Sequence, residues 1–115
     1  MVNGIHGILE NMTTHPTLYI GMPVTYTVGS DSYPGLITFV NPRARKFTFV
    51  KLDTTGVENG HIYTERELVL LRNPRKDEQQ SMTIASLRKD NVWRIMKSQI
   101  PVSPGQARFY RDPSF

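Results

Sequence analysis

Apolar and polar side chains alternate with a period of two along much of this 115-residue chain. Val24, Tyr26 and Val28 would face one side of an extended strand, with threonines between them on the other side. Residues 36–40 continue as a second strand after Tyr33-Pro34-Gly35, and residues 46–52 alternate again. The small polar residues and prolines between these segments favour tight turns. This part of the chain therefore predicts an antiparallel meander of three strands.

The rest of the chain predicts further short strands. Residues 61–72 predict one strand, or a strand pair around the polar break at 64–66, and residues 81–87 and 92–97 predict a hairpin. Eight prolines and eight glycines leave little room for long helices. Five or six short antiparallel strands predict an all-β fold, a small SH3-like barrel. An OB-like barrel, whose strands follow a longer Greek-key path, is the alternative.

The length of the chain predicts one domain over residues 1–115. Residues 1–21 are interpreted as an N-terminal arm that docks by an apolar stripe, residues 22–97 as the barrel and residues 98–115 as a C-terminal tail. The tail is aromatic near its end, and such side chains are expected to pack against a surface rather than remain in water.

The charges are distributed very unevenly. Residues 1–42 hold two acids and no lysine or arginine, a formal charge of −2, whereas residues 43–115 hold all fourteen basic side chains and eight acids, a charge of +6. Concentrated positive charge favours an anionic partner. The chain has no cysteine, no apolar stretch long enough to span a bilayer and no basic start of a signal peptide, so we expect a soluble cytoplasmic protein without a membrane partner.

Two groups of basic residues are candidate contacts for an anion. Arg43 and Arg45 lie on a predicted turn and could hold phosphate, because the guanidinium fork matches phosphate oxygens. A solvated turn that protects a sheet edge is the alternative. A more basic region follows from Arg88 to Arg111. There Trp93 could stack on a base, or it could be a core anchor.

The polar segment from Ser30 to Tyr33 precedes the second predicted strand and could accept hydrogen bonds from a ribose or a base edge. Alternatively, Asp31 caps the turn. Nucleotide recognition would require this loop to meet an arginine from elsewhere in the fold or from a second subunit. The candidate ligand-binding residues are Ser30, Asp31, Ser32, Tyr33, Arg43, Arg45, Arg88, Arg94, Arg108, Tyr110 and Arg111.

Enzymatic chemistry is not expected. His6, His15 and His61 have no spacing typical of a metal site, and no nucleophile or oxyanion donors accompany His61 and its neighbouring glutamates. The glycines fit turns rather than a phosphate-cradling loop. We therefore predict no catalytic residues, no metal and no cofactor.

Three stretches together resemble a family of small phage and prophage proteins. They are Ser30-Asp31-Ser32-Tyr33-Pro34, Leu87-Arg88-Lys89-Asp90-Asn91-Val92-Trp93-Arg94 and Tyr110-Arg111-Asp112-Pro113-Ser114-Phe115. The resemblance covers residues from about 22 to the end and implies a phage-encoded small barrel that acts in the bacterial cytoplasm. It brings no catalytic residues with it.

These observations leave three hypotheses for function. The first is a non-enzymatic binder of a small anionic, nucleotide-like ligand, working as a homo-oligomer. In a phage setting, such a protein would sequester a host defence messenger. The second is a small barrel that binds RNA or DNA by the same basic surface. The third is a protein-interaction module that blocks a host protein, or a minor structural component.

Overall fold

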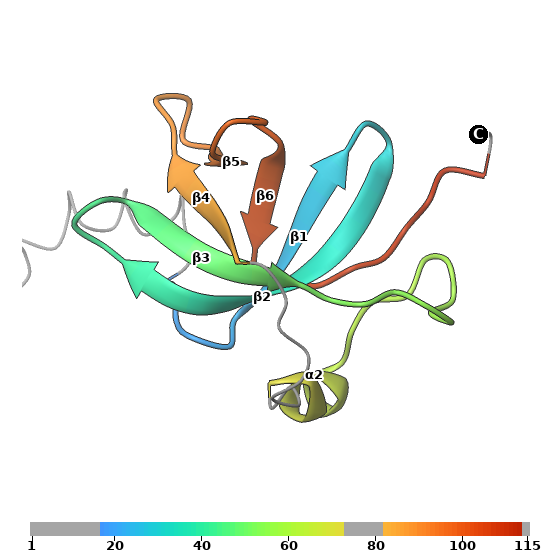
Figure 1. The fold of residues 1–115 in the computed structure, drawn as a ribbon. Coiled ribbons are helices and arrows are strands. Elements are labelled where there is room, and N and C mark those ends of the chain that lie inside the picture. Colours follow the sequence, from blue (N-terminus) through green and yellow to red (C-terminus); the bar gives the residue numbers. More distant parts are fainter. Residues whose placement is uncertain (1–16, 73–81, 114–115) are drawn as a thin grey trace, which may run out of the picture.

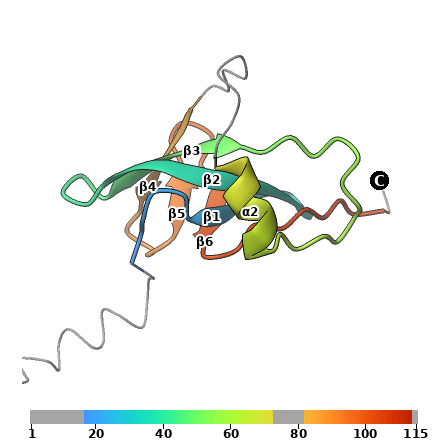
Figure 2. The ribbon, with the colours of Figure 1, turned by 90° about the horizontal axis from the view of Figure 1, so that it is seen from below.

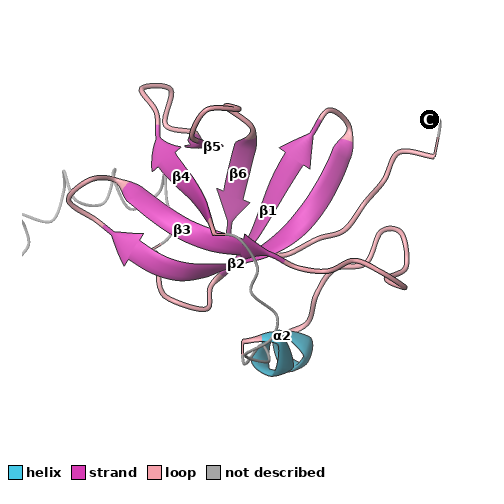
Figure 3. Ribbon diagram, in the orientation of Figure 1, coloured by secondary structure: helices cyan, strands magenta, loops and turns pink. Residues whose placement is uncertain are grey.

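A computed structural model of the chain describes residues 17–72 and 82–113, which form six antiparallel strands closed into a barrel (Figures 1 and 3). The strands are β1 (Pro23–Val28), β2 (Asp31–Asn41), β3 (Lys46–Lys51), β4 (Thr83–Leu87), β5 (Trp93–Ile95) and β6 (Pro101–Pro104). Neighbours in the barrel follow chain order, and β1 closes it by pairing with β6. The predicted small all-β barrel is confirmed, with a meander rather than the Greek-key path of an OB-fold.

The inner face of the barrel holds the main hydrophobic core. Alternation places Ile37 of β2, Phe47 and Phe49 of β3 and Val24 of β1 on this face, each at most 1% exposed. Trp93 packs here with its ring 4.8 Å from that of Phe47 and is buried. The interpretation of this tryptophan as a core anchor is therefore the one that the structure supports.

A second, smaller core lies on the outer face of β2 and β3. Leu36 and Val50 are register partners that point away from the barrel interior. Leu68 of the helix α2 (Glu65–Leu71) and Phe109 of the C-terminal segment pack against them. Figures 1 and 2 show α2 outside the barrel beside β2. This part of the β2–β3 ribbon is therefore buried on both faces.

The helix α2 corrects the predicted strand or strand pair at residues 61–72. Thr64 accepts a hydrogen bond from the backbone N–H of Glu67, and the Glu67 side chain accepts one from the backbone N–H of Thr64. This reciprocal capping box satisfies backbone donors at the helix start. Only Ile62 keeps a strand-like contact, a bridge to Arg108. The Thr-x-x-Glu spacing at 64–67 was the signal in the sequence that indicated a helix.

The barrel also differs from the predicted boundaries. It extends to Pro104, past the expected end at residue 97, because β6 lies in the segment interpreted as the tail. Pro101 and Pro104 sit at the two ends of this strand, where proline is best tolerated. Strand β2 begins already at Asp31, so the turn before it is shorter than predicted. Most of the predicted arm, residues 1–16, and the last two residues of the tail lie outside the described residues.

Gly35 is required where β2 crosses the core. A Cβ atom at this position would lie 2.8 Å from Cδ2 of Phe49 and 3.0 Å from the carbonyl oxygen of Val50. We expect Gly35→Ala to lower the free energy of unfolding by about 1–3 kcal/mol through overpacking. Urea denaturation measures this, with the exposed Val28→Ala as the control, expected to change stability by less than about 0.5 kcal/mol. Equal stability of the two variants would contradict the packing argument.

Candidate functional site

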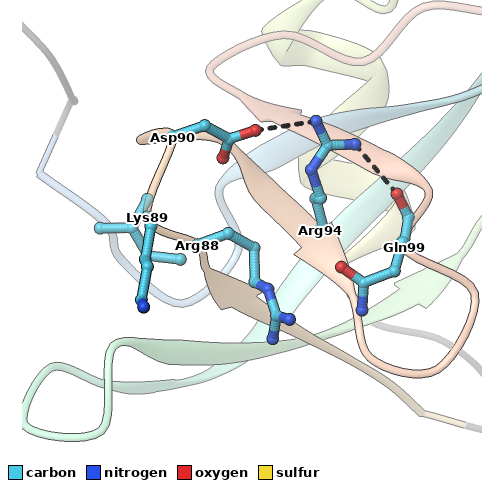
Figure 4. Close-up of a pocket in the computed structure, with 6 residues that line it drawn as sticks. Arg88, Lys89, Asp90, Arg94 and Gln99 are labelled. Atoms are coloured by element: carbon cyan, nitrogen blue, oxygen red, sulfur yellow. Dashed lines mark hydrogen bonds and ion pairs between the residues drawn. The ribbon is translucent and has the colours of Figure 1, made fainter.

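A groove lined largely by basic residues lies at the β4–β5 turn. It encloses about 670 Å³, and Figure 4 shows the polar side chains that line it. We call this site the basic groove; its lining residues are Leu87, Arg88, Lys89, Asp90, Arg94 and Gln99. Three of the six are cations and one is an acid, so the groove carries a net positive charge.

The two arginines of the groove differ in how they are held. Arg94 donates to the Asp90 carboxylate at 3.0 Å and to the backbone carbonyl of Gln99 at 3.1 Å (Figure 4). The hydrogen bond from Arg94 lowers the pKa of Asp90, so this acid stays ionised near neutral pH. Within the described part of the chain, the side chains of the exposed Arg88 and Lys89 contact no hydrogen-bond acceptor. No acid among residues 17–72 and 82–113 therefore pairs with these two cations.

The basic β2–β3 turn adjoins this groove. Lys46 pairs with Ser86 across β3 and β4, and the backbone N–H of Leu87 donates to the carbonyl oxygen of Arg45 at 3.0 Å. Arg43 belongs to the same turn, which closes with a bond from the N–H of Arg45 to the carbonyl of Pro42. The structure thus gathers Arg43, Arg45, Arg88 and Arg94 at one end of the barrel, although Leu87 comes 42 positions after Arg45 in the chain.

A second concave site, the polar pocket, lies between β1, β2, β6 and the C-terminal segment. It encloses about 300 Å³ and contains one cation, Arg108. The lining residues are Thr25, Thr27, Ser32, Ser103, Pro104, Gly105, Gln106 and Arg108. The guanidinium carbon of Arg108 lies 5.2 Å from the ring centre of Tyr110. This pocket offers hydroxyl groups and a single positive charge.

The polar segment at the start of β2 holds the C-terminal segment in place. Ser32 and Tyr110 exchange two backbone hydrogen bonds of 2.7 and 2.9 Å. The Asp31 carboxylate accepts from the backbone N–H of Asp112 at 2.8 Å and from the hydroxyl of Tyr33 at 3.3 Å. Asp31 therefore anchors the tail, a role that neither the ribose-binding nor the turn-capping interpretation included. Ser30 is exposed in the β1–β2 turn.

Arg111 is also tied to the body of the protein through its backbone. Its N–H donates to the side-chain oxygen of Asn59 at 2.7 Å, and its carbonyl accepts from the same amide at 3.0 Å. Of the predicted polar loop, Ser32 lines the polar pocket together with one cation, Arg108. The other four predicted arginines gather elsewhere, and the basic groove and polar pocket share no lining residue.

Several lining residues of the two sites were not predicted. Lys89 continues the basic run of the β4–β5 turn and was visible in the sequence. Thr25 and Thr27 were visible as the outward positions of the first strand. Gln99 and Gln106 carry no sequence signal, because only the closure of the barrel brings them beside residues from other strands.

The aromatic rings of Tyr26, Tyr33 and Phe49, which lie on neighbouring strands, pack against one another. The ring of Tyr26 lies 5.4 Å from that of Tyr33 and 5.8 Å from that of Phe49. Burial, with a smaller contribution from Tyr33, raises the pKa of Tyr26 to about 12. Tyr63 does not join these rings, because it packs in the second core.

Among residues 17–72 and 82–113, no group of three acidic or histidine side chains is placed to hold a metal ion. His61 contacts Glu67 at 2.8 Å, and Glu67 also caps α2. None of the helices that the structure describes is both long and apolar enough to cross a membrane.

No protein-family model, curated protein or solved structure matches this chain. The roles of the basic groove and the polar pocket are therefore argued from their own residues.

The half-buried Tyr26 side chain makes stability depend on alkaline pH. Its pKa is about 12 in the folded protein and 10.0 in the ordinary case, so the folded state holds this proton more tightly. The resulting stabilisation is complete below pH 10 and is lost as the pH rises through 12. We expect urea denaturation to show a fall in stability over this window that is smaller in Tyr26→Phe. A Tyr26→Phe variant with the same pH dependence as the original chain would contradict this.

Removing the Asp31 carboxylate should loosen the C-terminal segment. Asp31→Ala leaves the N–H of Asp112 and the hydroxyl of Tyr33 without their acceptor, which we expect to cost roughly 1–2 kcal/mol of stability. Trypsin should then cleave after Arg108 or Arg111 faster than in the original chain. Ser30→Ala, in the exposed turn next to it, is the control and should leave cleavage unchanged.

Proposed function

We propose that this protein is a non-enzymatic binder of a small anionic, nucleotide-like ligand, whose phosphate groups occupy the basic groove. The observation that carries the proposal is the pair Arg88 and Lys89. Both line a groove of about 670 Å³, and no acceptor among the described residues neutralises them. Unpaired cations in a concave site favour a ligand that supplies the missing negative charge.

The three cations of the groove are suited to different tasks. Arg94 is fixed in orientation by Asp90 and the Gln99 carbonyl, so it contributes a positioned charge with few free donors. Arg88 keeps its planar fork free and can bind two oxygens of one phosphate. Lys89 adds a charge on a flexible stem that can follow a second phosphate. Phosphates are therefore the part of the ligand that this groove recognises best.

The groove has no aromatic residue in its lining, so a base would have to be recognised elsewhere. The polar pocket has the hydroxyls, Arg108 and nearby Tyr110 for a sugar or base. The two sites share no residue, and the proposal has a ligand contact the basic groove of one copy of the chain and the polar pocket of another. This is why the proposal includes a homo-oligomer. In the phage setting that the sequence motifs imply, the bound ligand would be a host antiviral messenger, held without being converted.

A thermal-shift panel with the full chain tests the proposal. The probes are ATP, ADP, ADP-ribose, a cyclic mononucleotide and a cyclic dinucleotide. At a concentration of about 100 times its Kd, a ligand adds about 2.7 kcal/mol of stability, which raises the Tm of a domain of this size by several degrees. The ligand should be recovered unchanged by mass spectrometry. A panel without a shift, or conversion of the nucleotide, would count against the proposal.

A charge reversal locates the site. Arg88→Glu should abolish the thermal shift of the best probe. It replaces a guanidinium that donates hydrogen bonds to phosphate oxygens with a carboxylate that repels them. Arg66→Glu makes the same charge change at an exposed position of α2, outside the groove, and should leave the shift nearly intact. Equal losses in the two variants would indicate a general effect of net charge.

RNA or DNA binding is the second candidate function. It is favoured by the contact between the β2–β3 turn and β4, which continues the basic groove with Arg43 and Arg45. Such a surface is longer than one nucleotide requires. In this case the logarithm of oligonucleotide affinity should fall linearly with the logarithm of salt concentration, and Arg43→Glu should reduce the slope by about 1 or more. An oligonucleotide affinity that does not change with salt concentration would exclude nucleic-acid binding as the function.

A further inference from the structure

The strand register sorts the outer face of β2, β3, β4 and the chain after β5 into two parallel rows. Phe39 pairs with Thr48, Thr48 pairs with Ile84, and the backbone N–H of Met96 donates to the carbonyl of Ile84. The core residues between them point inward, so these four side chains point outward. We call this set, which crosses the sheet, the apolar row.

The apolar row is exposed to solvent. Phe39 is 56% exposed, Ile84 46% and Met96 40%. Met82, 67% exposed, lies next to it and meets the hydroxyl of Thr38 through its sulfur at 3.8 Å. Large apolar side chains that share one exposed face of a small protein mark a contact surface more often than isolated exposed residues do, and here Thr48 lies between Phe39 and Ile84.

The second row lies two residues along each strand and is basic. Lys46 pairs with Ser86, and Ser86 pairs with Arg94. Ser86 is only 7% exposed although it stands on the outer face, with a cationic residue on the strand at each side of it. We call these three residues the basic row. The outer face therefore carries an apolar row and a parallel positive row side by side.

The other end of the same face shows how such a surface is covered within this fold. There Leu36 and Val50 are capped by Leu68 of α2 and by Phe109. α2 is a short amphipathic element with a buried leucine and an acidic first turn. None of the described residues supplies an equivalent element for the apolar row.

We propose that the apolar row and the basic row form a docking surface for an amphipathic acidic segment of a partner protein, with apolar side chains along one edge and aspartates or glutamates along the next. The apolar residues of the partner lie over Phe39, Ile84 and Met96. Its carboxylates pair with Lys46, while Arg94 keeps its ion pair with Asp90. Charge complementarity fixes the orientation of the partner segment on the sheet. The flexible side chains of Met82 and Met96 adapt to the shape of its apolar residues.

A peptide fits this surface better than a nucleic acid does. Base stacking needs aromatic platforms, and the row has one aromatic ring, Phe39, beside aliphatic and thioether side chains. Helices that present apolar anchors at every third or fourth residue bind apolar surfaces of this kind. The basic row lies along one side of the apolar row only, which matches a segment with acids on one flank.

Fluorescence anisotropy with labelled peptides and the full chain tests this inference. The probe is a 16-residue amphipathic helix with leucines on one face and glutamates on one flank. Two matched probes replace every glutamate with lysine or every leucine with serine. The acidic probe should bind saturably, and each matched probe should bind at least tenfold more weakly. Absent binding of the acidic probe, or equal binding of the lysine probe, overturns the proposal.

Variants of the protein separate this surface from the basic groove. Phe39→Ala should weaken the acidic peptide about tenfold and leave the nucleotide thermal shift unchanged, whereas Arg88→Glu should do the reverse. Lys46→Glu should also weaken the peptide, and Val28→Ala, an exposed apolar residue of β1, is the matched control with no effect. Two other results assign the face to a different occupant and overturn the proposal. The first is a change in the molecular mass of the protein in solution on Phe39→Ala, with no change in peptide affinity. The second is displacement of the peptide by an oligonucleotide whose own binding is lost on Phe39→Ala.

Discussion

The burial of both faces of the β2–β3 ribbon is the constraint on which the rest of this structure depends. Ile37 and Phe49 fill the barrel on the inner face, while the adjacent Leu36 and Val50 require a cover on the outer face. The helix α2 and Phe109 provide this cover. Gly35 lies where the two faces meet most tightly, because there is no room for a Cβ atom beside Phe49. Closure of the barrel and docking of the C-terminal segment therefore depend on the same two strands.

This arrangement divides the surface into parts with different chemistry. The C-terminal segment must lie on the start of β2 to bury Phe109, and this fixes Arg108 beside the hydroxyls of the polar pocket. At the opposite end of β2, the strand continues past the second core to Phe39 and into the basic turn at Arg45. Among the residues that the structure describes, the cover of the outer face ends before this point, and an apolar row lies close to cations with no described acid partner.

The basic groove and the apolar row are neighbours with different chemistry. The groove presents point charges and suits phosphate, whereas the row presents apolar area and suits a peptide. Arg94 stands between them, since it lines the groove and ends the basic row. An anion bound in the groove would therefore change the electrostatic potential at the basic row, because Arg94 belongs to both.

The sequence by itself determined the barrel class, the hairpins and the inward residues, because period-two alternation and turn chemistry are local properties. It also marked the basic turns. It did not reveal α2, because the apolar run after Thr64 resembles a strand and the capping box depends on four residues only. Tertiary structure alone decided which charges meet. Asp31 became the anchor of the tail, and Arg45 became a neighbour of the β4–β5 turn, because strand pairing joins residues that are distant in the chain.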